Sequence, residues 1–216
     1  MQNEDVQTSD STSQFSQFQL SEPIMRALNS MKFTEPTVIQ QKTIPLLLEN
    51  DCDIVALAET GSGKTGAFGI PLIEKINAEV RDTQAVILCP TRELAMQVSE
   101  QIQKLSQYKK LTIATIYGGA SYIPQETALR KGAQVIVATP GRLIDFIEQG
   151  KAKLNKVQVI VLDEADEMIS LGFKEALEQI LESLKEGSQR WMFSATMNKQ
   201  VRQIADTYLN EPEQIL

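Results

Sequence analysis

The chain has 216 residues, a formal net charge of −7, a hydrophobic content of 42% and a charged content of 23%. These values are typical of one soluble globular domain. The absence of histidine excludes His-based triads and His-ligated metal sites. The sequence has two cysteines, no signal-peptide pattern and no apolar run as long as a membrane span. We therefore expect a cytoplasmic protein without a membrane anchor, whose catalytic groups are carboxylates, lysine, arginine and bound metal.

Residues 1–14 are almost entirely polar and are predicted to form a disordered tail. From Phe15 onward the chain is densely patterned, with helices predicted from Ser21 to about Met31 and over 41–49. Strand-like apolar runs then follow at 53–57, 85–89, 112–117, 134–138, 157–162 and 191–193. Helical patterns lie over 64–78, 91–106, 121–131, 141–149, 172–186 and 198–209. This alternation predicts an α/β fold, an open, mostly parallel twisted sheet with helices on both faces.

The most informative segment is residues 58–65, AETGSGKT, which lies between a predicted strand and a predicted helix. This pattern is typical of a phosphate-binding loop, in which glycines let backbone N–H groups surround phosphate oxygens. Lys64 is placed to reach the β and γ phosphates, and the Thr65 hydroxyl is placed to bind Mg²⁺. The alternative is a glycine-rich turn with an incidental lysine. The predicted nucleotide-binding residues here are Thr60, Gly61, Ser62, Gly63, Lys64, Thr65 and Gly66.

Each predicted strand is followed at once by a polar or glycine-bearing cluster. In an open parallel sheet these positions share the carboxyl edge, where ligands bind. We therefore expect one composite site rather than six unrelated turns. After the phosphate loop, the clusters are Pro90-Thr91-Arg92-Glu93, Gly118-Gly119, Thr139-Pro140-Gly141-Arg142, Asp163-Glu164-Ala165-Asp166 and Ser194-Ala195-Thr196.

Asp163 and Glu164 end the apolar run 159–162 and are the predicted centre of the chemistry. Asp163 is placed to hold Mg²⁺, directly or through water, opposite Thr65. Glu164 is placed to polarise an attacking water, a role that a carboxylate fills in a chain without histidine. The predicted catalytic residues are therefore Glu164, Lys64 and Asp163. The alternative is a pair of exposed acids that cap the next helix.

Six motifs occur in a fixed order and together resemble the N-terminal RecA-like, ATP-binding domain of the DEAD-box RNA helicase family. They are GSGKT, PTRELA, the Gly118-Gly119 pair, TPGR, DEAD and SAT. Residues 33–40 resemble the family's adenine-sensing Q motif (15–41), with Phe15 as its upstream aromatic. The resemblance covers 15–216. Lys32 stands where the family usually has glycine, so the turn there is expected to differ slightly, and Glu59 stands where glutamine is commoner.

The resemblance implies a role for each matched residue. Adenine would be read by the Gln40 amide, with the Phe33 ring and the Glu35 backbone beside it, and Asp166, Ser194 and Thr196 would couple the nucleotide site to RNA. From the residues alone, Gln40 remains open as a helix N-terminal residue, Phe33 as a core aromatic and Asp166 as a structural tie. RNA would be contacted through its sugar–phosphate backbone, without base specificity. The RNA-contacting residues would be Pro90, Thr91, Arg92, Gly118, Gly119, Thr139, Pro140, Gly141 and Arg142.

The family resemblance also implies ATP and Mg²⁺ as cofactors and an ATP-dependent RNA helicase that separates or remodels short duplexes. In the family a second RecA-like domain with arginine fingers completes the site, and residues 1–216 contain no such segment. We therefore expect this chain, as a monomer, to bind nucleotide, to hydrolyse ATP slowly and not to unwind RNA. The net charge of −7 predicts weak RNA binding by this part alone. The alternatives are a stand-alone P-loop ATPase or switch and a nucleotide-dependent binding module.

Overall fold

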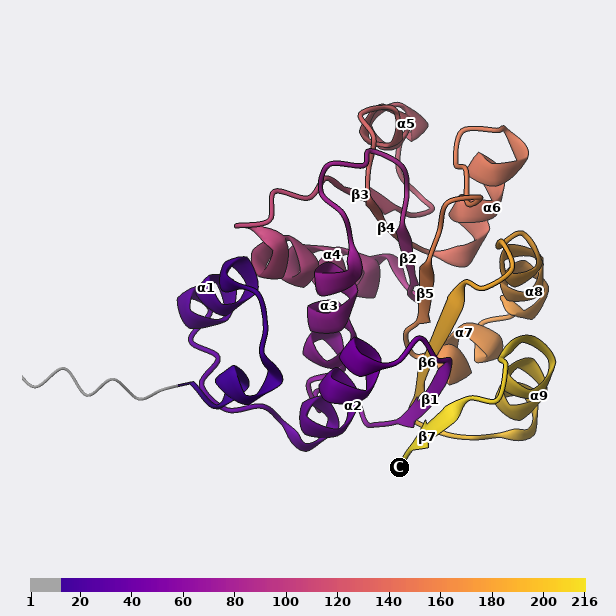
Figure 1. Ribbon diagram of the computed structural model, residues 1–216. Helices are drawn as coiled ribbons and strands as arrows, with labels where there is room; N and C mark the ends of the chain where they lie inside the picture. Colours follow the sequence, from indigo (N-terminus) through magenta and orange to yellow (C-terminus); the bar gives the residue numbers. More distant parts are fainter. Residues whose placement is uncertain (1–12) are drawn as a thin grey trace, which may run out of the picture.

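The computed structural model describes residues 13–216, which form one seven-stranded sheet in the order β3-β4-β2-β5-β6-β1-β7 (Figure 1). All six neighbouring strand pairs are parallel. The predicted α/β fold is thus confirmed, and the sheet within the described residues is parallel throughout. The strands are β1 (Ile54–Leu57), β2 (Ala85–Leu88), β3 (Ile113–Ile116), β4 (Val135–Ala138), β5 (Val159–Leu162), β6 (Gln189–Ser194) and β7 (Glu213–Ile215).

Helices cover both faces of the sheet, with α1 to α4 on one face and α5 to α9 on the other (Figure 1). The first four are α1 (Glu22–Ser30), α2 (Val38–Glu49), α3 (Lys64–Lys75) and α4 (Arg92–Ser106), preceded by the short 3₁₀ helix η1 (Gln14–Phe18). The others are α5 (Tyr122–Arg130), α6 (Pro140–Glu148), α7 (Ala165–Ser170), α8 (Lys174–Glu182) and α9 (Lys199–Tyr208). The sequence patterns did not predict η1, α7, β7 or the first turn of α2.

The strands are continuously apolar because successive side chains enter two different cores. In β2, Ala85 and Ile87 pack with α1 to α4, whereas Val86 and Leu88 pack with the helices of the opposite face. All four side chains are buried. Both cores exclude water from the strands, so the positions of the strand ends are fixed by packing on both sides.

The N-terminal boundary differs from the prediction. Residues 1–12 of the predicted tail lie outside the described residues, but Ser13 caps η1 and Gln14 is its first residue. Folded structure therefore begins before Phe15. Among residues 13–216, every helix is too short or too polar to cross a lipid bilayer.

The turn before Phe33 places a lysine in a backbone conformation suited to glycine. Lys32 has φ = 58°, the left-handed region that glycine favours. The expected difference from the family's turn stays a prediction.

Candidate nucleotide-binding site

The order of the strands sorts the predicted motifs along one edge of the sheet. The carboxyl ends of β5, β6 and β1 carry the DEAD, SAT and GSGKT segments as neighbours. The carboxyl ends of β3, β4 and β2 carry the Gly118-Gly119, TPGR and PTRE segments as neighbours. Because all the strands are parallel, the predicted nucleotide motifs occupy one half of this edge and the predicted RNA motifs occupy the other.

The phosphate loop is held by Gln40. Its side-chain Nε2 donates to the Gly63 carbonyl at 3.0 Å, and its Oε1 accepts from the Thr37 N–H at 3.0 Å within a capping box at the start of α2. A Cβ on Gly66 would lie 2.6 Å from this Nε2, and one on Gly63 would lie 2.8 Å from it. The two glycines therefore form the space that the Gln40 amide fills. The amide that was predicted to read adenine is committed to the protein in this conformation.

Lys64 lines the same cavity as the two carboxylates that are predicted to be catalytic. Its Nζ is buried, has no hydrogen-bond partner among the described residues and lies 3.6 Å from Glu164 Oε1. The Thr60 hydroxyl donates to the same Glu164 oxygen at 2.8 Å. Glu164 itself has φ = 55°, a strained conformation of the kind that is concentrated at functional sites. A buried ammonium without hydrogen bonds is suited to receive an anion.

The two carboxylates have opposite ionisation tendencies. Burial raises the pKa of Asp163 to about 7, against the lowering effect of the Lys64 ammonium. Burial also acts to raise the pKa of Glu164, but hydrogen bonds with Glu167 and Thr60, together with Lys64, hold it below its ordinary value. Glu164 is thus ionised at neutral pH, as a base must be. Because the pKa of Asp163 is near neutral pH, a cation bound beside it would keep its carboxylate fully ionised.

The residues fit a magnesium ion that is held jointly by the protein and a nucleotide. Asp163 Oδ1 is buried without a hydrogen-bond partner among the described residues, and Thr65 lines the same cavity. Residues 13–216 contain no cluster of three or more metal-ligating side chains. A P-loop site needs none, because the phosphates and water supply the other ligands of Mg²⁺.

A cavity of about 310 Å³ unites most of the predicted nucleotide residues. Two predicted residues lie elsewhere: the Glu35 carboxylate accepts from Gln14 Nε2 at 3.2 Å, and the Ser62 hydroxyl donates to the Glu59 carbonyl at 2.7 Å. The predicted residues that line the cavity are Phe33, Gln40, Thr60, Gly61, Gly63, Lys64, Thr65, Gly66, Asp163 and Glu164. Sequence analysis missed its other wall, which consists of Met31, Leu94, Gln97, Gln101 and Leu105. The helical spacing of the last four of these residues on α4 was visible, but the face that α4 turns to the cavity was not, and Met31 comes from the end of α1.

Asp166 links the start of α7 to the segment after β6. Its Oδ2 accepts from the Thr196 hydroxyl at 2.8 Å and from the Thr196 N–H at 3.0 Å. The Ser194 hydroxyl instead donates to the Thr196 carbonyl at 2.8 Å. Burial acts to raise the pKa of Asp166, and the hydrogen bonds from this segment lower it overall. The DEAD and SAT segments are thus joined, although by one hydroxyl and backbone groups rather than by two hydroxyls.

Two arginines connect the predicted RNA segments, because Arg92 and Arg142 both contact the chain around Gly118 and Gly119. The Arg92 guanidinium lies 4.9 Å from the centre of the Tyr117 ring, beside Gly118, and Arg142 Nη1 donates to the Ala120 carbonyl at 3.1 Å. Arg142 is 8% exposed, lies over the Tyr122 ring and pairs with Asp145. It therefore holds α6 against the glycine loop. The groups here that remain open to an RNA phosphate include the glycine backbone and the Arg92 side chain.

Thr139, Pro140 and Gly141 begin α6, with Thr139 as the N-cap and Pro140 at the first position. Pro90 and Thr91 precede α4, where the Thr91 hydroxyl accepts from the Leu94 N–H at 3.2 Å. Both segments are helix N-termini on the same edge of the sheet. Backbone N–H groups at helix N-termini favour anions.

Comparison with known proteins agrees with this geometry. A family model described as DEAD/DEAH box helicase matches residues 37–204. The chain is 47% identical over 201 residues to the DEAD-box ATP-dependent RNA helicase CshA of Bacillus subtilis, covering 93% of this chain and 40% of that protein. It is 48% identical over 199 residues to the CshA of Geobacillus kaustophilus, covering 92% of this chain and 42% of that protein. The chain thus spans about 40% of the length of these curated relatives.

Solved structures give the same result. A crystal structure of a DEAD box protein from Methanococcus jannaschii superposes with a TM-score of 0.90 at 44% identity, covering 93% of this chain and 55% of that one. An RNA helicase structure from Sulfolobus tokodaii, described as hypothetical, gives a TM-score of 0.84 at 35% identity, covering 91% and 57%. The chain belongs to the DEAD/DEAH box helicase family, and its fold is that of the family's RecA-like domains.

Proposed function

We propose that this chain is the ATP-binding and RNA-contacting half of an ATP-dependent RNA helicase that hydrolyses ATP to separate or remodel short RNA duplexes. The observation that carries the proposal is the Lys64–Glu164–Asp163 group, which shares one edge of the sheet with the helix N-termini and glycine loop of the other motifs. One half of this edge suits a polyphosphate and the other suits a phosphodiester backbone.

The protein groups divide the work of hydrolysis. The Lys64 ammonium, now facing Glu164 at 3.6 Å, would turn to the β and γ phosphates. Glu164, which is oriented by Thr60 and kept ionised, would accept the proton of the attacking water. Asp163 and Thr65 would hold Mg²⁺, which supplies charge stabilisation on the transferring phosphate. The cavity has apolar walls beside Phe33 and Leu94 that suit the adenine ring.

Activity would require more than this chain. A second RecA-like domain would supply the arginine finger, which typically contributes about 10³ to 10⁵ in rate in phosphoryl transfer. Residues 1–216 alone would then bind nucleotide, hydrolyse it slowly and leave a duplex intact. RNA would be contacted through sugar and phosphate, so the base sequence would have little effect on binding.

The test is ATP hydrolysis by residues 1–216 with and without single-stranded RNA, and with and without a second RecA-like domain added as a separate chain. We expect slow basal turnover that rises only when both are present. Turnover without dependence on RNA would favour a stand-alone P-loop ATPase. Tight binding to a protein with no turnover in any combination would favour a binding module.

Glu164→Gln should abolish hydrolysis and keep nucleotide binding, because the amide cannot accept the proton of water but conserves the shape of the side chain. Glu175→Gln on α8 is the matched control, since Glu175 is exposed and makes no ion pair among the described residues. Loss of nucleotide binding in Glu164→Gln, at unchanged stability, would contradict the assignment of Glu164 as the base.

A further inference from the structure

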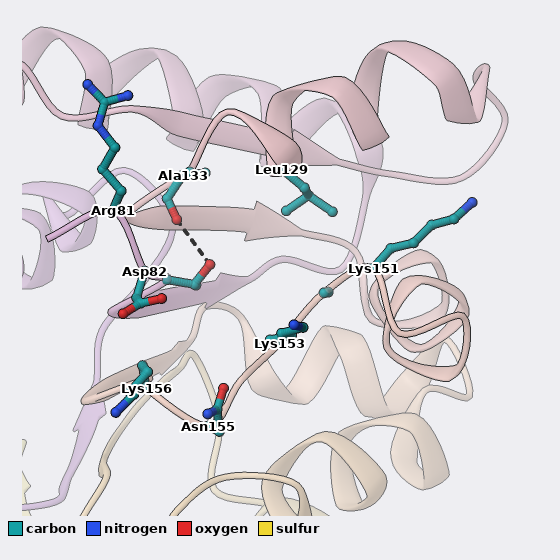
Figure 2. A pocket seen from close by; sticks show the side chains of 11 residues that line it. Arg81, Asp82, Leu129, Ala133, Lys151, Lys153, Asn155 and Lys156 are labelled. Carbon is teal, nitrogen blue, oxygen red and sulfur yellow. Dashed lines mark hydrogen bonds between the residues drawn. The ribbon is translucent and has the colours of Figure 1, made fainter.

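A second polar pocket lies at the amino ends of β2, β4 and β5, at the opposite end of these strands from the nucleotide site (Figure 2). Its volume is about 310 Å³. Three segments form it: 81–83 before β2, the end of α5 with the turn to β4 (129–133), and 151–156 before β5. The Thr83 hydroxyl donates to the Ala133 carbonyl at 3.0 Å and fixes two of these segments together (Figure 2).

The pocket is rich in cations although the chain as a whole carries −7. Arg81, Lys151, Lys153 and Lys156 line it, and Asp82 is the one acidic side chain in its lining. Lys151 Nζ pairs with Glu126 at 2.9 Å. Arg81, Lys153 and Lys156 take part in none of the ion pairs formed within residues 13–216. Three positive charges are therefore free to meet an anion.

The loop before β5 presents its lysines from a fixed backbone. Ala152 and Leu154 are buried in the core on the α5 to α9 face, whereas Lys151 and Lys153, which alternate with them, are exposed. The N–H groups of Lys151 and Ala152 both donate to the Phe146 carbonyl. The segment bends at Ala152 and turns at 155–156, so Lys153 and Lys156 lie on one short, curved loop. Arg81 on the loop before β2 adds a third cation to the same lining. Several separate cations suit the successive phosphates of a strand better than a single phosphate.

We propose that this pocket is a second contact site for the phosphodiester backbone of single-stranded RNA, apart from the path along the carboxyl edge. The proposal rests on the proposed function only in taking RNA as the ligand. Lysine, arginine and asparagine side chains, here including Asn155, are the groups that contact phosphates. An acidic peptide fits less well, because the lining has no aromatic residue and Leu129 is its one large apolar side chain.

The test uses the 1–216 chain and fluorescently labelled single strands of about 25 and about 6 nucleotides. Lys153→Ala/Lys156→Ala is compared with Lys185→Ala/Arg202→Ala, which removes the same charge from exposed positions near α8 and on α9. For the long strand, loss of two phosphate contacts should lower the slope of log K against log salt by about 1.4 and weaken low-salt binding about tenfold. The short strand, held at the carboxyl edge, should bind as before, and the control double variant should match the wild type for both strands.

Several results would overturn the proposal. Unchanged long-strand binding would do so, as would an equal loss in the control variant. Loss of polyglutamate binding with RNA binding intact would identify an acidic-peptide site. Inorganic phosphate at constant ionic strength is the third test. If it displaces the long strand from the wild type but not from Lys153→Ala/Lys156→Ala, the pocket binds free anions. Arg92→Ala tests the proposed RNA path along the carboxyl edge separately. If this variant binds the short strand as the wild type does, that path is wrong, independently of the result for the second pocket.

Discussion

Lys32 and Glu164 are both held in a left-handed backbone conformation, but only for Glu164 do we propose a chemical role that accounts for the strain. Lys32 lies one residue before Phe33, is exposed, and its side chain makes no ion pair within residues 13–216. The strain at Glu164 orients a carboxylate toward Thr60 and Lys64. The strain at Lys32 should therefore be removable without loss of function.

Lys32→Gly should raise the free energy of unfolding by about 0.5–1 kcal/mol, because relief of the left-handed strain exceeds the added entropy of glycine in the unfolded chain. Lys131→Gly is the matched control, since Lys131 is also exposed and has φ = −70°. Lys131→Gly should lower the free energy of unfolding by a similar amount. At this ordinary φ, glycine relieves no strain and only adds conformational entropy to the unfolded chain. Urea unfolding of the three proteins measures both values. Equal destabilisation by the two substitutions would contradict the argument.

Asp163 should make the stability of the ligand-free chain depend on pH. Its pKa is raised by burial from 3.8 to about 7, so between these values the folded state holds a proton that the unfolded state releases. Stability from this group is therefore greatest at low pH and is lost as pH rises from about 4 to about 7. The change is on the order of 2–4 kcal/mol.

Asp163→Asn should remove this part of the pH dependence, because an amide does not titrate. The measurement is the denaturation midpoint of both proteins from pH 5 to pH 8. Asp206→Asn, which changes an exposed carboxylate on α9, should keep the wild-type profile. A wild-type profile in Asp163→Asn would show that this carboxyl is ionised throughout the range.

At the scale of elements, the sequence patterns predicted six strands because each is apolar on both faces. β7 was missed because Glu213 and Gln214 are exposed, only Ile215 is buried, and the strand pairs on one side alone. The helix α7 was missed because its six residues begin directly after Asp163 and Glu164, where no separate apolar stripe is visible. The motifs predict the candidate site residues, but the contact of Gln40 with the phosphate loop and the burial of Arg142 depend on distant segments and could not be predicted from them.

The attachment of β7 depends on Asp53. Its Oδ1 accepts from the Arg190 N–H at 2.7 Å and its Oδ2 accepts from the Asn210 N–H at 2.8 Å. Because Asp53 is only 7% exposed, replacing one of its oxygens by an NH₂ group sets a backbone N–H against a second donor at a poorly solvated position. Asp53→Asn should destabilise the chain by about 1–3 kcal/mol, as measured by urea unfolding.

Asp206→Asn serves as the reference for Asp53→Asn, because it makes the same chemical change at an exposed position. Hydrogen exchange locates the effect: amides of β7 and β1 should lose protection more than those of β3 and β4. A uniform loss across the sheet would mean that Asp53 stabilises the whole domain rather than this edge.

Across the whole molecule, the proposed nucleotide and RNA sites share one edge of a single sheet. The nucleotide half of the carboxyl edge and the RNA half meet at β2 and β5, where the Asp163 N–H donates to the Leu88 carbonyl at 2.9 Å. Because both halves are attached to the same buried strands, binding at either should stabilise the whole domain against unfolding. The magnitude follows from ligand concentration and affinity alone if the domain unfolds as one unit.

Mg²⁺-ATP should therefore raise the free energy of unfolding of residues 1–216 by about 2.7 kcal/mol at one hundred times its Kd. Lys64→Met should lose most of this increase, because the methionine keeps the length of the apolar stem but removes the buried ammonium that would meet the phosphates. Lys75→Met, on the same helix but paired with Asp51 at the surface, should keep the full increase. Thermal unfolding with and without nucleotide measures both. An undiminished increase in Lys64→Met would show that the phosphates bind away from this loop, and the assignment of the cavity would then fail.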